Sequence, residues 1–135
     1  MENLYQYAYL SCIRPEVSLT RVYEIVQVSR KNNRNANITG ILVFDGWRFF
    51  QYIEGADDTV LDLVRKLRQD ERHHQFTELL STPFAGPRLF RNWSMGYSVT
   101  ADESLLTAFT RLTPGEVVLR IPDLVDSVDS VDLEP

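Results

Sequence analysis

The sequence predicts an α+β fold in which two helices lie on one face of a largely antiparallel sheet. Three observations predict it. Stretches with the two-residue period of strands alternate with two stretches that have the 3.6-residue period of helices. The dipeptide Asp45-Gly46 separates two apolar runs and suits a tight hairpin turn. The length of 135 residues fits one ordinary domain.

The first two elements come from residues 4–33. Residues 4–11, LYQYAYLS, place Tyr5, Tyr7, Tyr9 and Ser11 on one side of a predicted strand. Ser18 is suited to cap the helix that follows, and Asn32 with Asn33 would close it. One face of that helix has the spacing i, i+3, i+4, i+7, formed by Val22, Ile25, Val26 and Ser29.

The next elements are a hairpin and a second helix. Residues 38–55 give two strands around Asp45 and Gly46, since a tight turn needs residues that tolerate positive φ. Asp57 and Asp58 favour a helix start, because negative charge is stabilising at the helix N-terminus. The predicted second helix runs to about Gln69, with an apolar stripe of Val60, Leu61, Val64 and Leu67.

Two further strands complete the predicted domain, which covers residues 1–100. FTELLSTPF and FRNWSMGYSV predict them, with a turn at Gly86-Pro87 between them and with Pro83 at a strand end or edge. The order β-α-β-β-α-β-β is that of ferredoxin-like folds, with strand one next to strand three after a right-handed crossover. Residues 101–135 are expected to form an acidic tail that holds a short helix in ADESLLTAF or is ordered by a partner, because Pro114-Gly115 and Pro122 interrupt a long helix.

Composition and charge exclude several classes. Residues 1–100 hold 12 Lys and Arg against 11 Asp and Glu, which lacks the basic surface that a nucleic-acid-binding domain needs. Cys12, His73 and His74 lack metal-ligand spacing, so no metal site is expected. The chain shows no signal core and no run of eighteen apolar residues, so we expect a cytoplasmic protein without a membrane partner.

One polar residue stands out in an apolar strand. Gln51 shares a predicted face with Phe49 and Ile53, and a buried amide without partners would cost roughly 1–3 kcal/mol. Taken singly, Tyr9 and Gln51 are read as a structural hydrogen bond. Together with Trp93 and Met95 they could form a polar patch under two helices, and Asn32, Asn33, Asp70, Arg72 and His73 would flank the opening of a groove suited to a planar aromatic ligand.

Several separated motifs then show a family resemblance over residues 4–99. Tyr9 with Ser11, NNRNANITGILV, FFQYIEG, QDERHH and NWSM follow one another in the order and spacing of a BLUF domain. The chain therefore resembles the blue-light sensors that use flavin.

The resemblance implies a noncovalently bound FAD whose ring lies between the two helices. Asn33 would bind the pyrimidine edge of the ring with help from Asn32, and Gln51 would lie between the Tyr9 phenol and the flavin. Asp70, Arg72 and His73 correspond to residues near the ribityl and phosphate part. Lys66 stands where relatives often carry Arg or His, so it would offer the phosphate a point charge.

The resemblance also implies a mechanism without enzymatic turnover. Tyr9 would give an electron and then a proton to the photoexcited cofactor, and after their return Gln51 would be left rotated or tautomerised, with a red-shifted absorption. Gln51 suits this role because an amide is both donor and acceptor. The signal would pass to the last strand, where Trp93 and Met95 could exchange places, and on to an unknown effector protein.

Two alternatives on the same fold stay open at this point. One is an RNA-binding module that stacks bases on sheet aromatics, although no RNP1 pattern is present. The other is an acylphosphatase-type hydrolase, although a glycine-rich phosphate loop is missing. The short, proline-interrupted tail leaves one sheet face without predicted helices, so we expect a partner chain, including a second copy, to cover the face of Leu4, Ala8 and Leu10.

Overall fold

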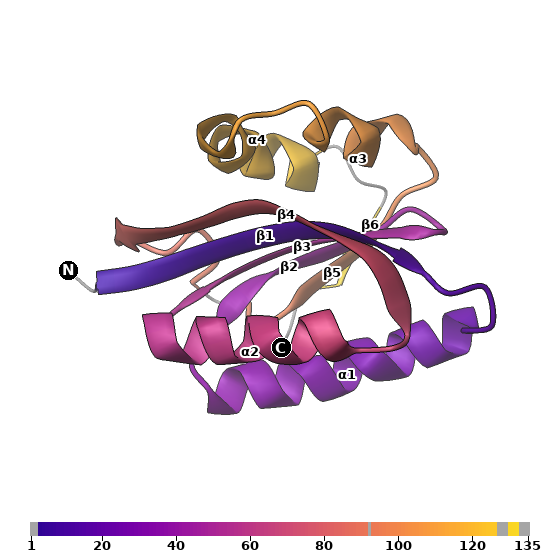
Figure 1. The fold of residues 1–135 in the computed structure, drawn as a ribbon, viewed down its shortest axis with the longest axis horizontal. Coiled ribbons are helices and arrows are strands. Elements are labelled where there is room, and N and C mark those ends of the chain that lie inside the picture. Colours follow the sequence, from indigo (N-terminus) through magenta and orange to yellow (C-terminus); the bar gives the residue numbers. More distant parts are fainter. Residues whose placement is uncertain (1–2, 92, 127–129, 133–135) are drawn as a thin grey trace.

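The computed structural model describes residues 3–91, 93–126 and 130–132 and consists of one sheet between two helical layers (Figure 1). The strands follow the order β4-β1-β3-β2-β5-β6 across the sheet. Their bounds are β1 Asn3–Ile13, β2 Thr39–Phe44, β3 Arg48–Gly55, β4 His73–Ala85, β5 Gly96–Val99 and β6 Ser130–Asp132. The helices are α1 Leu19–Asn35, α2 Asp57–Gln69, α3 Ser104–Phe109 and α4 Pro114–Asp126.

Local sequence signals explain the first helices and the hairpin. The Ser18 hydroxyl accepts from the Arg21 N–H at the start of α1, and Asp57 and Asp58 occupy the first turn of α2. In the turn between β2 and β3, Gly46 has a φ of 104°. The Asp45 carboxylate accepts from the backbone N–H groups of Trp47 and Arg48, which closes that turn. The predicted starts of both helices and the predicted hairpin are confirmed, whereas α1 continues past Asn32 and Asn33 and ends at Asn35.

The predicted pairing of the first strand with the third is also confirmed. β1 pairs antiparallel with β3 on one side and with the edge strand β4 on the other. Pro83 lies on that edge strand, where its missing N–H is tolerated. β2 and β5 form the one parallel pair among the described strands.

The last strand is shorter in the structure than the sequence predicts. FRNWSMGYSV yields only the strand β5, Gly96–Val99, and β5 pairs with β2 on the side of the sheet away from β4. Residues 86–95 connect the edge strand to β5. Trp93 and Met95 therefore precede the strand, and the alternation of side chains along a strand does not govern which way they point.

Helices cover both faces of the sheet. α1 and α2 cover one face, and α3 and α4 cover the other (Figure 1). On the α3 and α4 face, Ala8, Leu10 and Phe50 belong to a buried cluster that includes side chains from both of these helices. The expectation that this face would need a partner chain or a second copy is wrong, because the chain's own residues 104–126 occupy it.

The structure also gives the reason why the two prolines fail to prevent α4. Pro114 is the first residue of the helix, a position where its missing N–H costs nothing. Pro122 lies inside the helix, where it costs about 3 kcal/mol. Burying one large aliphatic side chain contributes about 1.5–3 kcal/mol, and Val117, Ile121 and Leu124 are all buried against the sheet. Tertiary burial therefore outweighs the local penalty.

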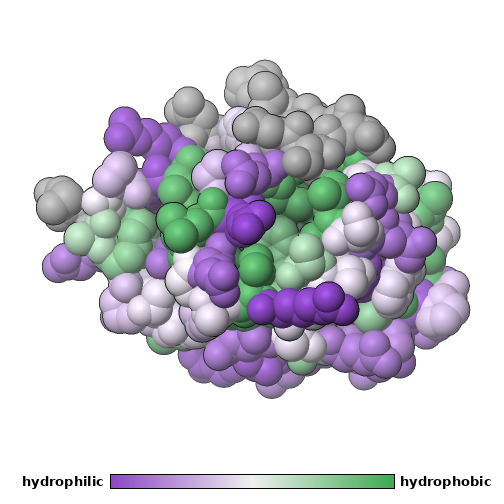
Figure 2. Space-filling view, turned by 90° about the horizontal axis from the view of Figure 1, so that it is seen from above, coloured by the Kyte–Doolittle hydropathy of each residue, from purple (hydrophilic) through white to green (hydrophobic). Residues whose placement is uncertain are grey.

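The rest of the predicted tail is only partly described. The short helix predicted in ADESLLTAF is α3, and β6 pairs antiparallel with β5. The remainder of the acidic tail, residues 127–129 and 133–135, lies outside the described residues. Seen from the α3 and α4 side, hydrophobic and hydrophilic residues are mixed on the surface (Figure 2). None of the helices in the described part of the chain is long and apolar enough to cross a membrane.

Candidate functional site

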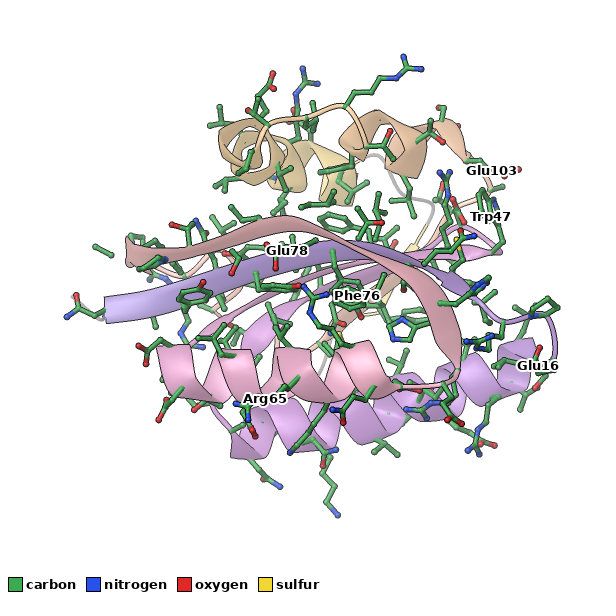
Figure 3. All side chains as sticks on the ribbon, viewed as in Figure 1. Glu16, Trp47, Arg65, Phe76, Glu78 and Glu103 are labelled. Carbon is green, nitrogen blue, oxygen red and sulfur yellow. The ribbon has the colours of Figure 1, made fainter. Side chains whose placement is uncertain are left out.

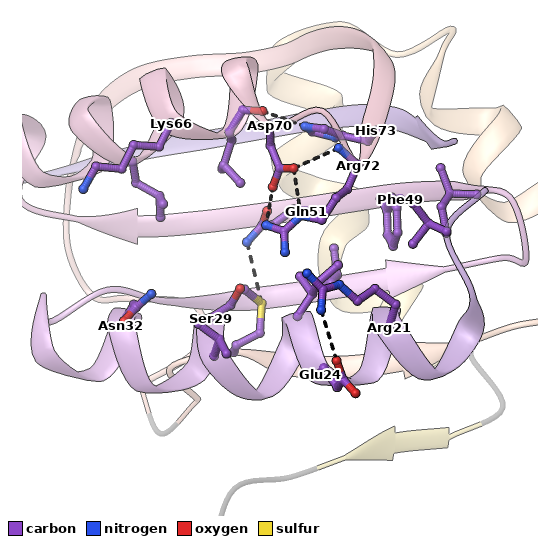
Figure 4. A pocket seen from close by; sticks show the side chains of 18 of the residues that line it. Arg21, Glu24, Ser29, Asn32, Phe49, Gln51, Lys66, Asp70, Arg72 and His73 are labelled. Carbon is purple, nitrogen blue, oxygen red and sulfur yellow. Dashed lines mark hydrogen bonds and ion pairs between the residues drawn. The ribbon is translucent and has the colours of Figure 1, made fainter. Parts of the chain in front are cut away.

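A cavity of about 350 Å³ lies between α1, α2 and the sheet (Figure 4). Its size is in the range of small-molecule sites. The aliphatic side chains of Ile25 and Val28 on α1 and of Leu63 and Leu67 on α2 form part of its wall. Polar side chains from β1, β3 and both helices reach it as well, so the cavity has apolar sides and a few hydrogen-bonding groups.

Tyr9 and Gln51 meet in the wall of this cavity. The β1–β3 register sets them directly opposite each other, so their side chains emerge on the same face at close range. The Tyr9 Oη donates to the Gln51 Oε1 at 2.5 Å, and both side chains are only 3% exposed. The predicted pairing of phenol and amide is present.

Met95 provides the second partner of the Gln51 amide. The Gln51 Nε2 donates to the Met95 Sδ at 3.6 Å, and Met95 is buried (Figure 4). A thioether sulfur is a weak acceptor, so it holds the amide N–H less firmly than an oxygen would. Gln51 is thus fixed at its oxygen by Tyr9 and loosely held at its nitrogen.

The surroundings of Tyr9 keep its phenol neutral. Its ring stacks on Phe76 of β4 with ring centroids 4.3 Å apart, and Phe76 lies between the sheet and α2 (Figure 3). Burial raises the pKa of Tyr9 far above the usual value, and the negative charge of Asp70 raises it further. At neutral pH the phenol therefore retains its proton and can donate it to Gln51.

Ser11 and His73 form a second hydrogen-bonded pair beside Tyr9. The His73 Nε2 lies 2.6 Å from the Leu67 carbonyl oxygen, which can only accept, so this nitrogen donates. The His73 Nδ1 lies 2.7 Å from the Ser11 Oγ. His73 lines the cavity, and Ser11 supports it from β1 without lining the cavity itself. The pair ties the end of α2 to the sheet.

Charged side chains gather at the mouth of the cavity. The Arg72 Nε donates to the Asp70 Oδ1 at 2.8 Å, and this bond holds the pKa of Asp70 below its usual value while raising that of Arg72. Lys66 pairs with Asp62 at 3.5 Å and keeps its side chain 75% exposed. Arg21 of α1 also lines the cavity and pairs with Glu24. Each of these three cations is paired with a carboxylate, so an anionic group at this mouth would compete with Asp70, Asp62 or Glu24 for it.

Besides Ser11, two predicted site residues do not line the cavity. Asn32 lines the cavity, but Asn33 is buried beside it and its Nδ2 donates to the Ser94 carbonyl at 2.9 Å. Trp93 stacks on Phe90 and belongs to the cluster on the α3 and α4 face. The sequence pattern grouped Trp93 with Met95 because they are two residues apart, whereas only Met95 reaches the cavity.

Sequence reasoning missed several residues that shape this site. Arg21 and Glu24 are part of the lining, and Phe76 forms one side of the Tyr9 environment. Glu54 is fully buried, and it is not among the predicted site residues. A charged residue in the apolar run FFQYIEG is the one signal that could have revealed Glu54.

The donors and walls of the cavity fit a flavin nucleotide. Apolar side chains on two facing helices suit the faces of a flat ring, and the amides of Gln51 and Asn32 suit a ring edge that both donates and accepts. The cations at the mouth suit a phosphate. Among the described residues, no group of three His, Cys, Asp or Glu side chains could hold a metal ion.

Comparison with known proteins also indicates a flavin-binding protein. Residues 4–96 match the family model described as sensors of blue-light using FAD, or BLUF. The blue light- and temperature-regulated antirepressor BluF of Escherichia coli K12 is 38% identical over 72 residues, which are 53% of this chain and 18% of that protein. Photoactivated adenylate cyclase subunit beta of Euglena longa is 33% identical over 72 residues, 53% of this chain and 8% of that protein. The chain thus spans less than a fifth of either relative.

Solved structures extend the similarity to nearly the whole chain. The dark-state structure of BlrB, a BLUF protein, has a TM-score of 0.77 at 27% identity, covering 93% of this chain and 96% of that one. The photo-activated state of BlsA has a TM-score of 0.77 at 21% identity, covering 98% and 99%, and this second likeness supports the fold alone. With the family model matched over most of its length, the chain belongs to the BLUF family of flavin-binding blue-light sensors.

Proposed function

We propose that this chain senses blue light through an FAD bound between α1 and α2 and passes the signal to a separate protein. The observation that carries the proposal is the continuous set of contacts from the Tyr9 phenol through the Gln51 amide to the Met95 sulfur, at the wall of the cavity. When bound, the flavin would supply the absorption of blue light and the electron acceptor.

Each residue of this set has a role that follows from its chemistry. Tyr9 stays protonated, so its phenol can give up an electron and a proton and take them back. Gln51 can accept from Tyr9 at its oxygen and can turn, because the Met95 sulfur holds its nitrogen only weakly. A rotated or tautomerised Gln51 presents a different hydrogen bond to the cofactor, and that change would shift the absorption to the red.

The mouth of the cavity supports a phosphorylated cofactor. Arg72 would offer a phosphate a planar, bidentate donor once it releases Asp70, and Lys66 and Arg21 would offer charge in exchange for their pairs with Asp62 and Glu24. Asn32 lines the cavity and is assigned to the ring edge, and Asn33 is assigned to that edge only if it releases Ser94. FAD, as in the family description, is preferred over FMN, and chromatography of the flavin released by denaturing the protein distinguishes the two.

We propose that this chain passes the light signal to a separate protein and catalyses no reaction itself. The matches to adenylate cyclases cover only 8% of those proteins, so their catalytic activity is not carried over by the similarity. The RNA-binding and acylphosphatase alternatives are not supported by the relatives found. In the described part of the chain, helices also cover both faces of the sheet, which leaves little aromatic sheet surface on which bases could stack.

The first test is the visible spectrum of the purified protein with FAD, before and after blue illumination. We expect a yellow protein whose absorption shifts to the red in light and returns in darkness. Tyr9→Phe should bind FAD and lose the shift, because the phenyl ring keeps the stacking on Phe76 but lacks the proton and the hydrogen bond to Gln51.

Tyr5→Phe is the matched control for this experiment. Tyr5 lies on the same strand, and its phenol contacts Ser81 at 2.6 Å instead of the cavity. We expect its shift to equal that of the wild type. A full light-induced shift in Tyr9→Phe would refute the role of Tyr9, and a protein that refuses FAD would refute the function itself.

A further inference from the structure

A buried carboxylate lies on the face of β3 opposite to Gln51. Glu54 is 0% exposed, and from the described part of the chain its two oxygens accept four hydrogen bonds. Oε1 accepts from the Tyr52 hydroxyl at 2.9 Å and from the Leu89 backbone N–H at 2.8 Å. Oε2 accepts from the Thr39 hydroxyl at 2.8 Å and from the Phe90 backbone N–H at 2.9 Å. Each oxygen thus binds one hydroxyl and one backbone donor.

The two backbone donors belong to residues 86–95, the segment that crosses from β4 to β5. A buried carboxylate is costly unless it is fully hydrogen-bonded, and here half of its partners come from this segment. Glu54 therefore fixes the middle of this connection, whose described residues 86–91 and 93–95 form no strand or helix.

A line of contacts runs from this anchor to Met95. The Phe90 ring stacks on Trp93 with centroids 5.3 Å apart, and the Trp93 carbonyl accepts from the Gly40 N–H at 2.9 Å. The Met95 carbonyl accepts from the Arg30 Nε at 2.8 Å, and Arg30 is itself buried. The segment is thus held at its middle and at its end, and its last side chain contacts Gln51.

We propose that Glu54 is a positioning residue that sets the place of the Met95 sulfur against the Gln51 amide. It acts through the segment 86–95 and does not touch the cavity. The proposal rests on the proposed function, in which Gln51 turns between a strong partner and a weak one. Through this segment Glu54 fixes the Met95 sulfur beside the Gln51 amide. The position of the sulfur in turn affects how fast the Gln51 side chain returns to its dark-state orientation.

The chemistry of the site makes Glu54→Gln a sharp test. An amide has one oxygen and one NH₂, so one of the two backbone N–H groups would face another donor. The hydroxyls of Tyr52 and Thr39 can rotate and accept a hydrogen bond from the new NH₂ group, whereas a backbone N–H can only donate. The variant keeps the size of the side chain and removes one anchor of the segment.

Methionine labelling reports on Met95 directly. The chain holds two methionines, Met1 and Met95, so protein grown with methyl-¹³C methionine gives two methyl signals, and Met95→Leu assigns one of them. With FAD added and in the dark, we expect the Met95 signal of Glu54→Gln to move or broaden by more than its linewidth. Dark recovery should change by roughly two- to thirtyfold, the range reached by residues coupled through packed contacts.

Two controls separate positioning from loss of a buried polar group. Asp45→Asn also removes a buried carboxylate, at the β2–β3 turn, and should leave the Met95 signal in place. Tyr52→Phe removes a hydroxyl from Glu54 while both backbone bonds remain, and should also leave it in place. If Glu54→Gln does not fold, Phe90→Leu removes the ring that stacks on Trp93 while it keeps the backbone bond to Glu54, and it should move the signal instead.

The outcomes distinguish this proposal from the function on which it rests. An unmoved Met95 signal in folded Glu54→Gln overturns the positioning role, even if the wild type shifts in light. A moved signal in a protein that shows no light response upholds the positioning role and rejects the photoreceptor. In the Met95→Leu background, Glu54→Gln should have no further effect on recovery, and an undiminished effect would also reject the proposal.

Discussion

At the scale of the residue, the side chain of Gln51 accounts for why an amide occupies a buried strand. A glutamate at this position would bring a charge next to the neutral Tyr9 phenol, and a leucine would make no hydrogen bond. The amide instead accepts from Tyr9 and donates to Met95. Its two ends have partners of unequal strength, which is the property that a two-position switch requires.

The neutral phenol leads to a prediction about pH. Burial raises the pKa of Tyr9, and likewise those of Tyr7 and Tyr52, above the usual value of about 10. Since these groups ionise more easily in the unfolded chain, their contribution to stability should be fully present below pH 10 and should decrease above it, by up to about 1.4 kcal/mol per pH unit for each. Denaturant titrations at a series of pH values measure this decline.

The same series tests Tyr9 specifically. The light-induced shift should persist above pH 10 for as long as the protein stays folded, because the phenol keeps its proton. Tyr9→Phe should show a shallower loss of stability with pH than the wild type. Ultraviolet absorbance of a phenolate at Tyr9 in the folded protein near pH 10 would contradict this expectation.

Sequence reasoning was accurate at this scale where the strand period applied. Tyr9 and Gln51 lie on long strands, so the two-residue period of side-chain direction assigned both to the cavity face. It left open which of Trp93 and Met95 faces the cavity, because both precede β5 and the two-residue period of a strand does not apply to them. Asn33 and Asn32 adjoin on one helix, and only packing against residue 94 decides which of them reaches the cavity.

At the scale of the element, the hairpin depends on a close approach of two backbones. A Cβ added to Gly40 on β2 would lie 2.0 Å from the Tyr52 carbonyl oxygen of β3, far inside contact distance. Because backbone atoms cannot move aside cheaply, Gly40→Ala should lower the free energy of unfolding by about 1–3 kcal/mol or more. Urea denaturation followed by circular dichroism measures the loss.

Gly115→Ala is the matched control for that substitution. Nothing lies within 4 Å of a Cβ at Gly115, and the residue is helical in α4. We expect unchanged stability or a gain of up to about 1 kcal/mol, since alanine favours the helix. Equal losses in both variants would show that the approach of β2 and β3 is not the cause.

The helix α4 shows the limit of local sequence rules for elements. Its prolines predicted an interruption, and the rule itself is sound for an isolated peptide. The apolar residues Val117, Ile121 and Leu124 recur at the spacing of one helical face, a signal that competed with the prolines in the same segment. Only the sheet, which is built from residues far away in the chain, gives that face something to bury.

At the scale of the whole molecule, α3 and α4 close the sheet on the side away from the cavity. Phe109 of α3 is 4% exposed and packs on Phe50 of β3 with ring centroids 4.6 Å apart. Phe109→Ala should lower the free energy of unfolding by about 3–5 kcal/mol through the cavity that it leaves. FAD binding should remain under conditions where the variant is folded, because Phe109 does not line the cavity.

A surface residue of the same helical layer provides the comparison. Leu119 of α4 is 75% exposed, so Leu119→Ala should change stability by less than about 0.5 kcal/mol. Chemical denaturation of both variants, with flavin fluorescence as a second signal, measures the difference. Loss of FAD from folded Phe109→Ala would mean that the two faces of the sheet are not independent.

Most of the architecture followed from the sequence because its first five elements carry strong local signals. Ser18, the Asp45-Gly46 turn and the paired Asp57-Asp58 each mark a boundary by their own chemistry. The path of residues 86–95 and the covered second face depend on contacts between distant parts of the chain. No window of sequence contains those contacts.

The same distances set the order in which the molecule can assemble. Tyr9 and Gln51 are 42 positions apart, and Gln51 and Met95 are 44 positions apart. Contacts of such long range form late, after the hairpin and helices, because the chain must first lose the entropy of closing large loops. The light response should therefore mark completed folding. A full-length chain that is still partly unfolded contains Tyr9, Gln51 and Met95 but lacks the contacts among them, so its absorption should not shift.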